Sequence, residues 1–225
     1  MNADSTAWTK RQASLGCTQR AVLFKRFPDW LNGLIHRRQV AFVLRSLPLG
    51  VQAVLDVGCG YGRVAEAVLR ARPGAEIEGI ESCTAFAEHF EKHFGRCHRL
   101  PVQQFRPARA YDAILIVTVL MYLTDHERTE VLRILWDCLA PGGRLICIEP
   151  AVEMVWRARR LLRKRDWADP TSGIRYFTKQ EFTEVLTTPK DAALIGRRSV
   201  SLIPGLGLTV VHHCVAVEKR GGGSC

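Results

Sequence analysis

The stretch from residue 51 to residue 71 constrains this chain more than any other. Residues 51–57 are apolar at all but two positions, which predicts a short strand buried on both faces. Three glycines at alternating positions follow it: Gly58, Gly60 and Gly62. Glycine permits positive φ and lets a ligand approach the backbone closely. Residues 63–71 have helical composition and end before a Pro-Gly stop signal. A strand, a glycine loop and a helix N-terminus together predict a nucleotide-type binding site.

Two residues distinguish this loop from the dinucleotide-binding fingerprint. That fingerprint needs glycine at its sixth position, where this chain has Arg63. Asp56 stands at the end of the strand, next to the loop, and its carboxylate would repel a pyrophosphate but attract an ammonium group. We therefore expect a ligand that carries positive charge near the loop. S-adenosylmethionine meets this condition, since it has an α-amino group and a sulfonium.

The pattern of an acidic residue followed by x-Gly-x-Gly-x-Gly resembles motif I of the class I S-adenosylmethionine-dependent methyltransferases. Residues 51–150 resemble that family's core in the order of their elements, and a weaker resemblance continues to about residue 187. The resemblance implies an α/β fold, a Rossmann-like three-layer sandwich. Its seven-stranded sheet would be mostly parallel with an antiparallel last strand, joined by N-terminal helices and a helical lid insertion. It also implies an enzyme of the small-molecule type with S-adenosylmethionine as its cofactor.

A second acidic residue, Glu81, closes the alternating strand pattern of residues 76–81. The resemblance implies that Glu81 binds both ribose hydroxyls of the cofactor. Without the resemblance, Glu81 would be interpreted as a solvated glutamate at the end of a strand. Where many family members have an acidic residue for the adenine amino group, this chain has Pro101, so Gln103, Gln104 or a backbone group is expected to replace that contact. The expected cofactor-binding residues are Asp56, Gly58, Cys59, Gly60, Tyr61, Gly62, Glu81, Ser82, Val102, Gln103 and Thr118.

The long apolar run at residues 111–119 predicts a strand and resembles motif IV, after which the family places the methionine part of the cofactor and the acceptor. No Asn/Asp-Pro-Pro-Tyr/Phe sequence follows it, which argues against methylation of amide-type nitrogens. If the acceptor is a phenol or an amine, a base would remove a proton. The candidate catalytic residues are Tyr122, His126 and His36, whereas a carboxylate acceptor would need no base. Tyr122 could equally cap the sheet edge, and His36 could lie on a solvated helix face.

Outside the core, residues 1–18 show no pattern and residues 18–47 predict two helices. The resemblance implies that these helices cover the cofactor and line the acceptor site, whereas by their pattern alone they would pack against the sheet. Further strands are expected at 99–105 and 144–149, the latter after a Pro-Gly-Gly turn. A helix is expected at 127–139, with Asp125 either at its N-cap or entering the helix, and a capping box joins Thr178 and Glu181. Strands 199–203 and 208–217 should form a hairpin around residues 204–205.

The expected domain units are lid helices (1–50), cofactor-binding core (51–150), basic lid insertion (151–177), C-terminal part of the core (178–220) and tail (221–225).

The net charge of +10 lies entirely in the two flanks. Residues 1–50 hold eight basic and two acidic residues and residues 151–225 hold thirteen and seven, whereas residues 51–150 hold eleven and thirteen. Basic flanks indicate either an anionic small-molecule acceptor, a peripheral membrane contact through the basic helix expected at 151–164, nucleic acid, or solubility alone. No zinc cluster or aromatic-basic repeat supports stable nucleic-acid binding, and the oligomeric state is open.

The eight cysteines have no Cys-x-x-Cys spacing, which is typical of a reduced compartment. His89 and His93 lack the glutamate of a zinc-protease motif, because position 90 is Phe90, so no metal site is expected. No secretory signal or membrane span is visible, and we expect a cytoplasmic protein.

The sequence therefore favours methyl transfer from S-adenosylmethionine to an oxygen or nitrogen atom of a small metabolite. One alternative is a methyltransferase that acts on a nucleic acid or a protein through the basic flanks. Another is a non-catalytic binding module of the same fold, which intact Asp56 and Glu81 disfavour. A nicotinamide dehydrogenase is the least favoured, because of Asp56 and Arg63.

Overall fold

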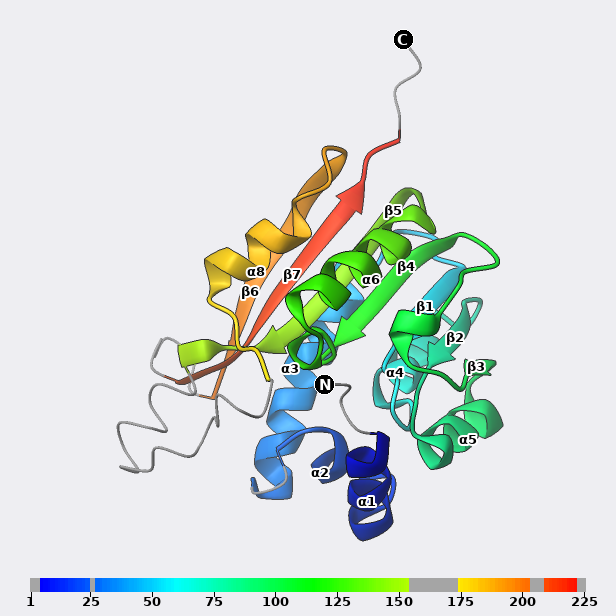
Figure 1. Cartoon of the computed structure of the whole chain (residues 1–225), viewed down its shortest axis with the longest axis vertical. Coiled ribbons are helices and arrows are strands. Elements are labelled where there is room, and N and C mark those ends of the chain that lie inside the picture. The colour runs from blue at the N-terminus through cyan, green and yellow to red at the C-terminus, as the bar shows by residue number, and fades with distance from the viewer. Residues whose placement is uncertain (1–4, 25–26, 154–173, 203–208, 222–225) are drawn as a thin grey trace.

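A single seven-stranded sheet forms the centre of the computed structural model, which describes residues 5–24, 27–153, 174–202 and 209–221 (Figure 1). The strand order is β3-β2-β1-β4-β5-β7-β6, and β7 runs antiparallel to both of its neighbours. The strands are β1 (Ala53–Val57), β2 (Glu76–Ile80), β3 (Cys97–His98), β4 (Tyr111–Val117), β5 (Leu139–Pro150), β6 (Ala192–Ser201) and β7 (Val210–Lys219). This is the mostly parallel α/β sheet that the resemblance implied.

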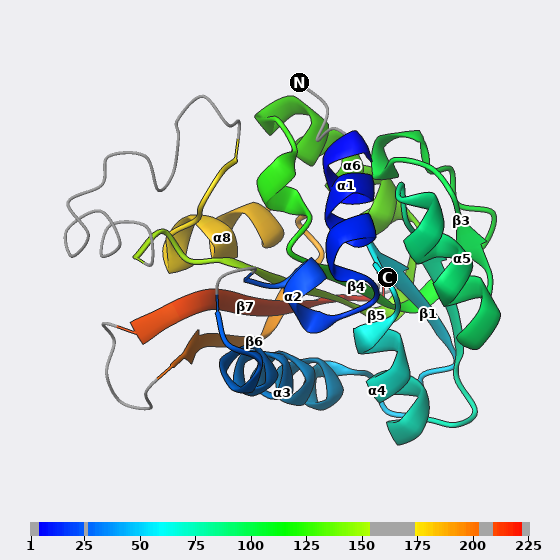
Figure 2. The same cartoon turned by 90° about the horizontal axis from the view of Figure 1, so that it is seen from below.

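Helices cover both faces of the sheet and complete three layers (Figure 2). The described helices are α1 (Ser5–Leu15), α2 (Gln19–Val22), α3 (Asp29–Ser46), α4 (Arg63–Ala71), α5 (Thr84–His93), α6 (Asp125–Asp137) and α8 (Lys179–Leu186). One apolar cluster joins α3, α4 and α5 to one face of the sheet, and a second joins α6 and α8 to the other. Strands buried on both faces explain why β1 and β4 read as continuous apolar runs.

The register of the parallel strands brings the chemically important residues to one edge. Val57 of β1 pairs with Ile80 of β2 and with Ile116 of β4. The loops that follow these three strands therefore leave the sheet side by side, as expected at the carboxyl edge of an open α/β sheet. The short helices α1 and α2 lie across this edge and not on a face of the sheet (Figures 1 and 2).

Several expected elements are confirmed at or near their predicted bounds. The helix after the glycine loop is α4, which begins at Arg63 and ends at Ala71. Thr178 caps α8 in the expected capping box with Glu181, in which each residue satisfies a backbone amide of the other.

Two expectations about element boundaries were wrong, and one that had been left open is decided. Residues before 18 were read as unpatterned, but α1 spans Ser5–Leu15. The third strand is Cys97–His98 and not 99–105, because Pro101 begins a 3-10 helix (Val102–Gln104) that takes the chain out of the sheet. Of the two roles expected for Asp125, the structure shows the second, because Asp125 is the first residue of α6. The N-cap is Thr124, whose hydroxyl oxygen accepts from the amide of Glu127, while the Glu127 carboxylate accepts from the amide of Thr124.

Other expectations fall wholly or mainly outside the described residues. The basic helix expected at 151–164 and the loop after it lie largely in 154–173, and the turn of the hairpin lies in 203–208. The two hairpin strands are described and pair antiparallel, as β6 and β7. None of the helices in the described ranges is both long enough and apolar enough to cross a bilayer.

Candidate functional site

A cavity of about 580 Å³ opens at the carboxyl edge of the sheet, and its lining includes Trp8 of α1 and Val22 of α2. Most of the residues expected to bind the cofactor line it: Asp56, Gly58, Cys59, Gly60, Glu81, Ser82, Val102, Gln103 and Thr118. Tyr61 and Gly62 do not. The Tyr61 ring packs against Phe86 and His89 of α5.

Backbone geometry explains two of the loop glycines. Gly58 has φ of 65°, and a Cβ atom there would overlap the Val119 side chain. Gly62 has φ of 91° and caps α4, and a Cβ atom there would overlap the Phe94 ring. Gly58 therefore lets the loop pack beneath the chain that follows β4, whereas Gly62 lets α4 start against α5.

Asp56 is fully buried, yet its Oδ2 atom has no hydrogen-bond partner among the described residues. Burial raises the pKa of this carboxyl group to about 7, against a lowering by the Arg63 charge and a further rise from Glu81. A buried polar atom without a partner is costly, so its presence in a cavity wall indicates a missing partner. A cationic ligand would supply that partner.

Glu81 lies just past β2 and organises the loops around the cavity. One carboxylate oxygen accepts from the amide of Gly60 (2.9 Å) and the other from the amide of Cys83 (2.8 Å). Burial raises the pKa of Glu81, and these amide hydrogen bonds lower it. Each carboxylate oxygen can accept more than one hydrogen bond, so both can still receive a ligand hydroxyl.

The adenine side of the expected site is formed by the 3-10 helix after Pro101. Val102 and Gln103 both line the cavity, as does Pro101 itself. The Gln103 amide nitrogen donates to Glu127 at the start of α6 (3.2 Å), which leaves its oxygen available as an acceptor.

The chain after β4 forms the opposite wall, and Glu149 holds it in place. Thr118 has φ of 60°, a conformation that is unusual for a β-branched residue and stores strain. Directly after it, the amides of Val119 (2.9 Å), Leu120 (2.7 Å) and Met121 (3.3 Å) donate to the Glu149 carboxylate. Burial raises the pKa of Glu149 to about 8, partly offset by these hydrogen bonds.

The three candidate catalytic residues lie in different places. Tyr122 lines the cavity, and burial raises the pKa of its phenol to about 12. His36 is not among the lining residues; its Nδ1 lies 3.0 Å from Nη1 of Arg63, and burial together with Arg63 lowers its pKa to about 4. His126 is exposed on α6 and is not among the lining residues. The structure therefore brings Tyr122 alone of the three into the cavity wall.

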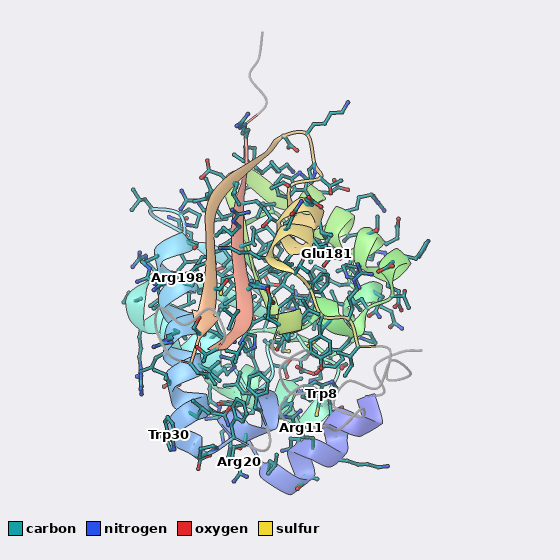
Figure 3. All side chains as sticks on the ribbon, turned by 90° about the vertical axis from the view of Figure 1, so that its left-hand side faces the viewer. Trp8, Arg11, Arg20, Trp30, Glu181 and Arg198 are labelled. Atoms are coloured by element: carbon teal, nitrogen blue, oxygen red, sulfur yellow. The ribbon has the colours of Figure 1, made fainter. Side chains whose placement is uncertain are left out.

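Sequence reasoning missed three residues that shape the site. Trp8 comes from α1, lines the cavity and packs edge-on against Tyr122 (ring centroids 5.6 Å apart), while the Arg11 guanidinium stacks on Trp8 (Figure 3). Arg63 lines the cavity although it was read only as a departure from a motif. Glu149 was read only as a strand end. A charged residue that directly ends an apolar strand is the one signal that could have identified it.

Comparisons with known proteins agree with this architecture. Trans-aconitate 2-methyltransferase of Methylobacterium radiotolerans is 28% identical over 145 residues, which cover 63% of this chain and 53% of that protein. Demethylmenaquinone methyltransferase of Thermotoga maritima is 32% identical over 120 residues, which cover 50% of this chain and 48% of that protein. The chain thus spans about half the length of the curated relatives it matches.

Among solved structures, the N-methyltransferase NodS of Bradyrhizobium japonicum, in complex with S-adenosyl-l-homocysteine, superposes with a TM-score of 0.70. The two sequences are 16% identical, and the superposition covers 97% of this chain and 100% of the NodS chain. This likeness shows the fold. The family model described as Methyltransferase domain matches residues 31–188, which is more than half of the chain. The chain therefore belongs to the methyltransferase-domain family.

Proposed function

We propose that this chain uses S-adenosylmethionine to methylate an oxygen or nitrogen atom of a small, anionic metabolite. The observation that carries the cofactor assignment is Asp56, a buried carboxylate with an unpartnered oxygen in the wall of the cavity. The α-ammonium group of S-adenosylmethionine supplies the opposite charge. Glu81 lies where it can accept from ribose hydroxyls, and 580 Å³ is in the range of cofactor-sized pockets.

The cofactor carries an activated methyl group, so the chain's own residues chiefly bind, orient and exclude water. The raised pKa of Tyr122 keeps its phenol protonated at neutral pH. Tyr122 therefore acts as a hydrogen-bond donor that orients the acceptor, and not as the base. His36 is neutral and bound to Arg63, so it holds the wall of the site and does not take a proton from the acceptor.

An anionic acceptor is supported by the charge of the flanks and by one relative. The two flanks carry all of the net charge of +10, and the lid helices belong to the N-terminal one. A relative named trans-aconitate 2-methyltransferase acts, by its name, on a polycarboxylate. A carboxylate acceptor also needs no base, which agrees with a cavity wall that holds no histidine among its described residues.

The test is a methyl-transfer assay with S-adenosylmethionine labelled in the methyl group. The acceptor panels are polycarboxylic acids, quinols and phenols, primary amines, and RNA. We expect labelled product with the polycarboxylic acids. That product should be a methyl ester, so mild base should release its labelled methyl group as methanol. Transfer to RNA instead would favour the alternative of a methyltransferase that acts on a nucleic acid. Binding of S-adenosylhomocysteine without transfer to any panel would favour a binding module, and absence of binding would remove the cofactor assignment.

A further inference from the structure

Two cysteine thiols meet beside the cavity. Cys59 lies in the glycine loop and lines the cavity, and Cys97 is the first residue of β3. Their Sγ atoms are 3.9 Å apart, and both side chains are buried. No step of the proposed methyl transfer uses either sulfur. Two thiols in contact can be oxidised to a disulfide, and in a reducing compartment such a bond is typically transient and redox-sensing.

Gly79 of β2 allows the two sulfurs to meet. It pairs with Asp56 of β1 on one side and with Cys97 of β3 on the other, so it separates the two strands. A Cβ atom at Gly79 would lie 2.6 Å from the Cys59 sulfur. Because glycine has no Cβ atom, the side chain of Cys59 can cross β2 and reach the sulfur of Cys97.

The cavity gives a small oxidant a route to Cys59 first. Cys59 is one of the lining residues and Cys97 is not. The two residues are only 6% and 5% exposed, so the cavity wall is where the pair can be reached. Burial, the contact with Cys97 and the charge of Asp56 raise the pKa of the Cys59 thiol, which makes its oxidation slow. A ligand that fills the cavity would cover Cys59 and slow the reaction further.

We propose that Cys59 and Cys97 form a reversible disulfide that weakens cofactor binding, with hydrogen peroxide as the oxidant. The Cys59 sulfur attacks one peroxide oxygen, the O–O bond breaks, and a sulfenic acid and one water molecule form. The Cys97 sulfur then attacks the Cys59 sulfur, the S–O bond breaks, and a second water molecule leaves. The two sulfurs together lose two electrons to the peroxide, and the two thiol protons end in the two water molecules.

The disulfide pulls the glycine loop out of its binding position. A disulfide holds its sulfur atoms about 2.05 Å apart, so about 2 Å of the present 3.9 Å must close. In the reduced chain the amide of Cys59 donates to the carbonyl oxygen of Ile80 (3.1 Å), and the amide of Gly60 donates to Glu81 (2.9 Å). Drawing Cys59 toward β3 strains both hydrogen bonds and displaces Glu81, the expected ribose ligand. This effect on affinity rests on the proposed use of S-adenosylmethionine, whereas formation of the disulfide does not.

The test combines peptide mapping with titration calorimetry on the full chain, before and after prolonged incubation with hydrogen peroxide. We expect a pair of peptides linked through Cys59 and Cys97. The oxidised chain should bind S-adenosylhomocysteine at least about tenfold more weakly than the reduced chain, and dithiothreitol should restore the affinity. Saturating S-adenosylhomocysteine during the incubation should lower the yield of linked peptide at least about fivefold, because it covers Cys59.

Cys97→Ala is the decisive variant, because Cys97 does not line the cavity. The reduced variant should bind S-adenosylhomocysteine within about threefold of the wild type. It should form no linked peptide and keep its affinity after the same peroxide treatment. Cys138→Ala is the matched control, since Cys138 is buried in the apolar cluster on the other face of the sheet and should leave the response to peroxide unchanged.

Three results would overturn the proposal: no linked peptide from the wild type, a linked peptide with unchanged affinity, or an equal loss of affinity in Cys97→Ala. The last result would assign the loss to oxidation of Cys59 alone. If Cys97→Ala does not fold, the oxidised and re-reduced wild-type chains decide. If the reduced wild type does not bind S-adenosylhomocysteine, the cofactor assignment fails, and the linked peptide alone decides whether the two thiols pair.

Discussion

At the scale of single residues, Asp56 and Glu149 show that a buried carboxyl group can either bind a ligand or stabilise the backbone. Both carboxyl groups are buried near the carboxyl edge of the sheet, and burial raises the pKa of each. Glu149 accepts three amide hydrogen bonds from the chain after β4, whereas Asp56 Oδ2 accepts none in the described part of the chain. Glu149 thus builds the wall of the cavity, and Asp56 is left to meet a ligand.

Replacing Glu149 should damage stability and the cavity together. Glu149→Ala leaves three buried amides without an acceptor, which should lower the free energy of unfolding by about 3 kcal/mol or more. Glu149→Gln keeps one acceptor oxygen and should cost about 1–2 kcal/mol. Urea unfolding measures both. Exposed Glu130 on α6 is the control, and Glu130→Gln should be neutral within about 0.5 kcal/mol. A Glu149→Ala variant as stable as the wild type would contradict this role.

At the scale of elements, α1 and α2 act as the cover of the cavity. Trp8 of α1 and Val22 of α2 are lining residues, although both helices lie far from the sheet's centre (Figures 1 and 2). Arg11 ties the two helices together by donating to the carbonyl oxygens of Arg20 (2.9 Å) and Leu23 (2.5 Å). Contacts at the edge of the sheet and between the two helices therefore hold α1 and α2 in position.

A variant of Trp8 tests whether this cover contributes to binding. Trp8→Ala should weaken S-adenosylhomocysteine about tenfold, since an aromatic wall of the cavity is lost, and should change Tm by less than about 3 °C. Trp30 of α3 is the control: its side chain is 70% exposed and lies at the outer margin of the molecule (Figure 3). Trp30→Ala should leave affinity unchanged in the same calorimetric titration. Equal effects from both tryptophans would show that α1 does not cover the ligand.

At the scale of the whole molecule, buried titratable groups set how stability depends on pH. Asp56 and Glu149 have raised pKa values of about 7 and about 8, so the folded chain holds protons there that the unfolded chain releases. Their contribution is present at low pH and is lost as pH rises toward 8. His36 and His212 have lowered pKa values of about 4 and about 3, so their contribution is lost as pH falls below about 6.5.

Stability of the ligand-free chain should therefore decline on the alkaline side of about pH 6. Between pH 6 and pH 8 we expect a loss of about 3 kcal/mol, or roughly 5–10 °C in Tm. Thermal unfolding followed by circular dichroism across this range measures it. Asp56→Asn removes one of the two acids and should make the decline smaller. A Tm that rises from pH 6 to pH 8 in the wild type would show that these carboxyl groups are ionised throughout.

The sequence by itself determined the sheet, most of its helices and the acid–glycine–acid frame of the site. Alternating glycines after an apolar strand and an acidic residue at the next strand end are local signals, because strand and helix periodicity and positive φ depend on neighbours in the chain. These signals placed Asp56, Gly58 and Glu81, which line one cavity in the structure.

Tertiary structure alone decided which distant side chains reach that cavity. Trp8 lies in a segment without pattern, and only the packing of α1 over the sheet edge brings it beside Tyr122. Glu149 acts through amides some thirty positions earlier in the chain, which meet it because β4 and β5 are neighbours. His36 and His126 have the same chemistry in the sequence, yet His36 is half-buried against Arg63 and His126 is exposed. Such differences arise from contacts between elements, and the order of residues along one element does not record them.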